Sequence, residues 1–74
     1  MSIFERIYGI LEEENKNLII LGTCEGRVIV IFKNKTYKVL KIWQAHPDFL
    51  DKIVKLNEKY FATTRYKTIK IWSY

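Results

Sequence analysis

The sequence has little of what usually stabilises so short a chain. Its 74 residues include one cysteine, Cys24, and one histidine, His46. Neither an intrachain disulfide nor a structural zinc site of Cys and His ligands can therefore form. Because a domain of this length buries a modest fraction of its surface, it often needs such a cross-link. We expect a well-packed small core, association with another chain, or a chain that is part of something larger.

The sequence also lacks the long apolar segments of membrane-inserted or secreted chains. Its longest purely apolar run, residues 28–32, is far too short to cross a bilayer. The N-terminal residues include an acid, Glu5, and no apolar stretch of signal-peptide length. With one free cysteine, these features favour the cytoplasm or nucleus and predict no membrane partner.

Residues that would indicate an enzyme are few. Residues 26–74 contain one histidine and three acids, without a recognisable nucleophile–base motif. Residues 22–26 have neither the glycine spacing nor the Lys-Ser/Thr ending of a phosphate-binding loop. Cys24 follows a β-rich stretch, and we interpret it as a small packed side chain. We therefore expect no catalytic residues, no metal site and no cofactor.

Positive charge is in excess and unevenly distributed. The net charge is +5, with two bases and five acids in residues 1–25 and eleven bases and three acids in residues 26–74. Because most lysines alternate with apolar residues, we interpret them as the solvated faces of strands. The alternative is a small basic β domain that stacks nucleic-acid bases on aromatics beside lysines. Its candidate residues are Tyr37, Lys38, Lys41, Tyr66, Lys67 and Lys70.

Strand-forming residues dominate the chain. Only three glycines and one proline are present, and 49% of residues are hydrophobic, which excludes a disordered or collagen-like chain. β-Branched and aromatic residues form runs separated by short polar clusters. The predicted strands are residues 6–11, 18–21, 27–32, 36–43, 53–56, 60–64 and 68–72. With such short connections, an all-β fold of antiparallel meander sheets is the economical topology.

Residues 2–14 also allow a helix. Ser2 with Glu5 resembles a capping box. The apolar residues that fall near helical spacing are Ile3, Phe4, Ile7, Ile10 and Leu11. Strand and helix therefore both remain open for this segment.

An internal repeat organises the rest of the chain. Residues 20–31 align without a gap on residues 61–72, an offset of 41 residues, with Thr23 over Thr64. A period near 40 with about four strands per repeat is typical of a β-propeller blade.

Residues 39–73 resemble one repeat of the WD-repeat β-propeller family, above all in the ending Thr68-Ile69-Lys70-Ile71-Trp72. In that family a strand leads into Gly-His, and the third strand ends in Trp-Asp. Ala45 stands in place of the glycine and Ser73 in place of the aspartate. The resemblance implies that residues 1–74 form one partial propeller. Its weak first blade would cover residues 7–43, and its second, without an outer strand, residues 44–74.

The resemblance also implies a set of structural residues. In the family a buried tetrad of His, Ser or Thr, Asp and Trp fixes each blade by hydrogen bonds. His46, Trp72 and either Thr63 or Thr64 match three of these positions, but the turn at residues 65–67 has no aspartate. The implied network is therefore incomplete. The other interpretation of His46 is a loop histidine without such a role.

These features predict a non-enzymatic interaction or scaffold module of WD-repeat type. Two blades cannot close a ring, so we expect the fold to be completed by further copies or by a protein partner. The resemblance implies that the second blade accepts a strand along its free edge. The edge-pairing candidates are Thr68, Ile69, Lys70, Ile71 and Trp72.

Overall fold

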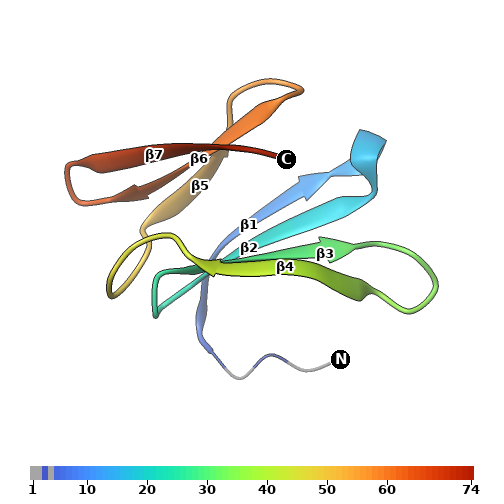
Figure 1. The fold of residues 1–74 in the computed structure, drawn as a ribbon, viewed down its shortest axis with the longest axis horizontal. Coiled ribbons are helices and arrows are strands. Elements are labelled where there is room, and N and C mark those ends of the chain that lie inside the picture. Colours follow the sequence, from blue (N-terminus) through green and yellow to red (C-terminus); the bar gives the residue numbers. More distant parts are fainter. Residues whose placement is uncertain (1–2, 4) are drawn as a thin grey trace.

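The computed structural model describes residue 3 and residues 5–74, and within them the chain forms seven strands and one short 3₁₀ helix (Figure 1). Strands β1 to β4 form a four-stranded sheet, called the first sheet, and β5 to β7 form a three-stranded one, the second sheet. All neighbouring strands are antiparallel and consecutive in the chain. This confirms the expected all-β class with antiparallel meander sheets. The elements are β1 (Ile7–Glu13), η1 (Glu14–Lys16), β2 (Leu18–Thr23), β3 (Arg27–Phe32), β4 (Lys38–Gln44), β5 (Lys52–Lys55), β6 (Tyr60–Arg65) and β7 (Thr68–Ser73).

The helical alternative for residues 2–14 is wrong where the structure describes them, because Ile7–Glu13 is a strand. Burial alternates along β1, and the strand pairs with β2 as far as Glu13 opposite Leu18. This cross-strand pairing outweighs the helical spacing of the apolar residues. A 3₁₀ turn and Asn17, with a φ of 53°, then reverse the chain. Ser2, the proposed capping residue, lies outside the described residues.

Burial separates the strands into central and edge ones. β2 and β3 are apolar at successive positions and are buried along most of their length. Such unbroken apolar runs are typical of strands covered on both faces. β4 and β7 alternate lysine with apolar residues and are mostly exposed. They are therefore the outer strands of their sheets.

The main core lies between the two sheets. Its buried residues are Ile20, Val28, Val30, Ala45, Leu50 and Phe61, with Leu11, Leu18, Trp43, Ile53, Trp72 and Tyr74 partly buried around them. β1 contacts β5, and a nearly buried Glu13 on β1 lies 2.9 Å from the ammonium of Lys55 on β5. The sheets come close at Gly22, where an added Cβ would lie 2.5 Å from the Leu50 side chain. Any larger residue at this position would have to push the buried Leu50 side chain aside, which favours glycine there.

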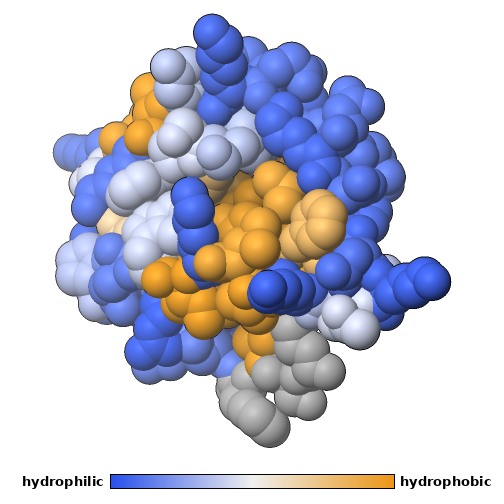
Figure 2. Space-filling model, turned by 45° about the vertical axis from the view of Figure 1, so that its right-hand side comes forward, coloured by the Kyte–Doolittle hydropathy of each residue, from blue (hydrophilic) through white to orange (hydrophobic). Residues whose placement is uncertain are grey.

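The outer face of each sheet is also apolar. Across the first sheet, Ile10, Leu21, Ile29 and Ile42 form one row of paired residues, of which the two at the sheet edges are exposed. The outer face of the second sheet exposes Val54, Ile69 and Ile71. Figure 2 shows one face of the molecule on which apolar side chains gather into a patch framed by hydrophilic ones. Such exposed patches are typical of surfaces that contact another chain.

We expect Gly22→Ala to lower the free energy of unfolding by about 1–3 kcal/mol, because the new methyl group overlaps Leu50 in a packed core. Gly9→Ala is the matched control, since its nearest neighbour, an Ile53 side-chain atom, would be 3.3 Å from the new Cβ. Urea unfolding followed by tryptophan fluorescence measures both. Equal losses for the two variants would contradict the close approach at Gly22.

Candidate functional site

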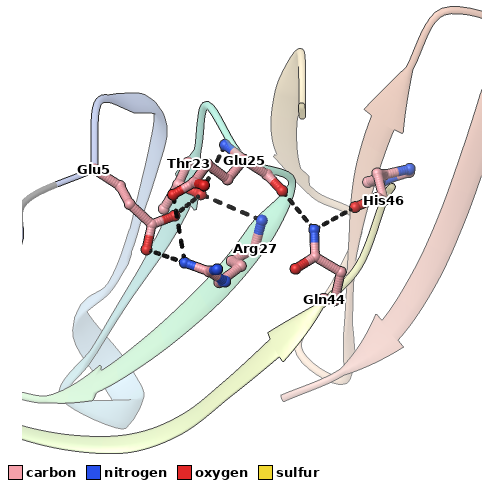
Figure 3. Close-up of polar contacts among 6 residues, drawn as sticks. All are labelled: Glu5, Thr23, Glu25, Arg27, Gln44 and His46. Carbon is pink, nitrogen blue, oxygen red and sulfur yellow. Dashed lines mark hydrogen bonds and ion pairs between the residues drawn. The ribbon is translucent and has the colours of Figure 1, made fainter. Parts of the chain in front are cut away.

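His46 is buried at the start of the β4–β5 loop, with 2% of its surface exposed. The backbone N–H groups of Ala45 and His46 donate to the Gly26 carbonyl at 2.9 and 3.0 Å. The Gln44 amide donates to the carbonyls of Glu25 and His46 (Figure 3). Gly26 has a φ of +81°, and an added Cβ would lie 2.3 Å from the His46 carbonyl oxygen. The loop that carries His46 is thus fixed to the β2–β3 turn.

Thr63 joins His46 to Trp72. Its Oγ1 lies 2.8 Å from Nε2 of His46 and accepts a 2.9 Å hydrogen bond from Nε1 of Trp72. Thr63 and Trp72 can meet because they lie on one face of adjacent strands, at diagonal positions. Since a hydroxyl has one donor and two acceptor sites, it can accept from the indole and donate to a neutral imidazole. We call these three residues the His–Thr–Trp cluster.

Thr64, the other threonine proposed for this role, lies on the opposite face of β6 and outside the cluster. Its carbonyl instead accepts a 2.7 Å hydrogen bond from the backbone N–H of Asp51. The pairing register makes the difference, because Thr63 stands opposite Lys70 and Thr64 opposite Ile69. The sequence left these two threonines undecided because either can be placed on the inner face until the register is known.

The β4–β5 loop supplies carboxylates to the β6–β7 turn, which has none of its own. Asp51 accepts a 2.9 Å hydrogen bond from the Tyr66 backbone N–H, and Asp48 pairs with the Arg65 guanidinium, one contact being 2.8 Å. Arg65 holds the pKa of Asp48 below its ordinary value, mainly through the hydrogen bond between them. Neither aspartate is predicted from the sequence pattern. Their only signal was their position in the loop that follows His46.

The surroundings of His46 favour its neutral form. Burial lowers its pKa below the ordinary 6.5, and the charges of Lys70 and Arg65 lower it further. The hydrogen bond to the Thr63 backbone and the charge of Asp51 oppose this shift without reversing it. Lys70 stays near the loop because its ammonium donates to the Ala45 carbonyl at 2.7 Å. A neutral ring is the form that can accept a hydrogen bond from Thr63.

The first sheet has no counterpart of the His–Thr–Trp cluster. The first residue of β7 comes 41 residues after the first residue of β3, whereas the first residue of β6 comes 42 residues after that of β2. The offsets differ because the β2–β3 connection is one residue longer than the β6–β7 connection. The ungapped offset is therefore wrong by one residue for β6. The corrected alignment places Leu21 and Ile31, both buried, at the positions of Thr63 and Trp72.

A different polar network closes this end of the first sheet. The Thr23 hydroxyl donates to Glu5 at 2.8 Å, and the Arg27 guanidinium pairs with the same carboxylate (Figure 3). Burial raises the pKa of Glu5, but the hydrogen bonds of Thr23 and Arg27 and the charge of Arg27 outweigh it, and the pKa is lowered. No sequence pattern predicts this network, because its members are up to 22 residues apart.

The edge-pairing candidates all lie on β7, which pairs with β6 alone in the described chain. Trp72 packs against the core between the sheets, and Lys70 reaches Ala45. Ile69 and Ile71 lie on the other face and are 68% and 62% exposed. The second edge of β7 is therefore available to a further strand.

The nucleic-acid candidates do not form one patch. Tyr37 and Lys38 lie at the β3–β4 end of the first sheet, while Tyr66 and Lys67 form the β6–β7 turn at the opposite side of the molecule (Figure 1). Lys41 and Lys70 lie on the outer strands between these ends, and the Lys70 ammonium already binds a backbone carbonyl.

Features of other functional classes were also sought in the part of the chain that the structure describes. No three His, Cys, Asp or Glu residues there are grouped so that they could hold a metal ion. No helix there is long and apolar enough to span a membrane. Cys24 is partly buried in the β2–β3 turn, where its N–H donates to the Arg6 carbonyl at 2.8 Å.

We expect Thr63→Val to lower the free energy of unfolding by about 1–3 kcal/mol. The substitution removes the hydroxyl and leaves the His46 ring nitrogen and the Trp72 indole N–H without their hydrogen-bond partner. Thr64→Val is the matched control and should cost less than about 0.5 kcal/mol. Urea unfolding measures both. A larger loss for Thr64→Val would contradict the assignment of Thr63 to the cluster.

Acidification should destabilise the protein below about pH 6.5, before most carboxylates titrate. The unfolded chain binds a proton at His46 near pH 6.5, whereas the folded chain, with its lowered pKa, does not. The contribution of neutral His46 to the free energy of unfolding is therefore complete above pH 6.5 and is lost as the pH falls towards the His46 pKa of the folded state. Urea midpoints between about pH 7 and pH 5 measure this effect. His46→Gln should make the urea midpoint less dependent on pH in this range, since the chain has no other histidine. An unchanged pH dependence would show that another group causes it.

Searches against protein-family models, curated proteins and solved structures find no match. Function is therefore inferred from the geometry of the two sheets and of the His–Thr–Trp cluster.

Proposed function

We propose that this chain is a non-enzymatic protein-interaction module of the WD-repeat type, built from two propeller-like blades. The observation that carries the proposal is the His–Thr–Trp cluster, in which Thr63 contacts both His46 and Trp72. These residues match three positions of the family's tetrad, and they connect the loop before the second sheet to its second and third strands. A rigid sheet fixed in this way is a suitable platform for binding another chain.

The strand arrangement supports a module that is completed by association. The first sheet has four strands and the second has three, with β5 lying against β1 as neighbouring innermost strands would. A closed propeller needs at least about four blades. The apolar rows on the two outer faces are where further blades would stack. Further copies of this chain or a partner protein would cover them.

The nucleic-acid alternative has less support. Its aromatic and basic candidates are divided between two ends of the molecule, and Lys70 is engaged by a carbonyl. A single-strand binding surface instead gathers aromatics along a continuous basic groove.

Light scattering coupled to size-exclusion chromatography tests the proposal. We expect a mass above that of the monomer that rises with protein concentration, because the outer apolar faces are free to associate. The double variant Ile69→Lys, Ile71→Lys should lower this mass without lowering stability, since both side chains are largely exposed. Tyr37→Lys, an exposed aromatic away from β7, serves as the control. A monomer at every concentration with one sharp thermal transition would overturn the proposal.

A further inference from the structure

The four sheet edges differ in how well they are protected from pairing. The pairing of β1 shifts register between Ile7 and Gly9, and that of β4 shifts opposite Val30 and Ile31. β5 has only four residues and lies against β1. β7 has six residues, and all of them pair with β6 in unbroken register. Bulges, short length and charged side chains all discourage strand addition. β7 has no bulge, and the ammonium of its one lysine, Lys70, is held by the Ala45 carbonyl, so β7 is the least protected edge in the described chain.

A surface hollow of about 290 Å³ adjoins this edge, lined by Lys41, Trp43, Trp72 and Ser73. The indoles of Trp43 and Trp72 meet edge to face, with ring centroids 5.3 Å apart. Trp72 belongs to the face of β7 that is turned towards the first sheet. A strand added to β7 would therefore place alternate side chains in this hollow and the others beside Ile69 and Ile71.

The positive charge around the free edge of β7 favours an added strand with acidic side chains. Neither β4 nor β7 contains an acidic residue, whereas β4 carries Lys38 and Lys41, β7 carries Lys70, and Lys67 precedes β7. Lys41 lines the hollow itself. The acids nearest in sequence are Asp48 and Asp51 after β4 and Glu58 before β7. They are already engaged by Arg65, by the Tyr66 N–H and by Lys55, respectively. An incoming acidic side chain would meet unopposed positive charge.

We propose that β7 binds an acidic, apolar extended segment of a partner protein by strand addition. The backbone of the segment pairs with β7, a large apolar side chain fills the hollow over Trp43 and Trp72, and a flanking carboxylate pairs with Lys41, which lines the hollow. This inference rests on the proposed function and specifies the partner. Main-chain pairing supplies affinity in such complexes, and the side-chain positions supply specificity.

A blocked peptide with the core Glu-Val-Leu-Val-Glu is the probe, and Lys-Val-Leu-Val-Lys, with equal strand propensity, is its control. We expect the acidic peptide to slow hydrogen exchange of the outward β7 amides about tenfold or more and to perturb tryptophan fluorescence. The basic peptide should do neither. Lys41→Glu should weaken binding of the acidic peptide about tenfold, while Lys35→Glu, in the β3–β4 connection outside the hollow, should leave it unchanged.

Other outcomes would overturn the inference and can be told apart from failure of the proposed function. Equal binding of both peptides would show non-selective apolar contact. Protection of β7 that rises with protein concentration without peptide would show that a second copy occupies the edge. Absence of any protection, in a protein that still self-associates by light scattering, would overturn this inference alone. A cooperative monomer would overturn the proposed function, whatever the peptide does.

Discussion

The hydroxyl of Thr63 is the point where three distant parts of the chain meet. It contacts the ring of His46, which lies 17 residues earlier, and the indole of Trp72, nine residues later. All three groups lie in or beside the core, where an unpaired polar group is costly and a paired one is well ordered. The second sheet therefore has one preferred placement of its strands relative to the loop that precedes it.

That loop also connects the two sheets. The Gly26 carbonyl accepts both the Ala45 and the His46 N–H, so the β2–β3 turn of the first sheet holds the histidine that organises the second. The hydrophobic core then packs between the sheets, where Leu50 of the same loop and Ile53 of β5 lie against Gly22. In a chain whose single cysteine cannot form an intrachain disulfide, this polar junction does part of what a cross-link would do.

The two sheets differ in what remains open. The first sheet is closed at one end by the Glu5, Thr23 and Arg27 network, and apart from Glu13 and Thr23 the buried side chains of its strands are apolar. The second sheet has a fixed inner face, an exposed apolar outer face and an unpaired strand edge. A strand-accepting interface needs a fixed inner face together with exposed apolar side chains and an unpaired strand edge.

The sequence by itself determined the strands, because runs of β-branched and aromatic residues between polar turns specify local extended structure. It also indicated which residue types would form the cluster, through the repeat and its Trp72 ending. Only the tertiary structure decided between Thr63 and Thr64, brought Asp48 and Asp51 to the β6–β7 turn, and excluded a helix over β1. The physical reason is that register and long-range pairing depend on residues far apart in the chain, and shifting a strand by one residue exchanges its two faces.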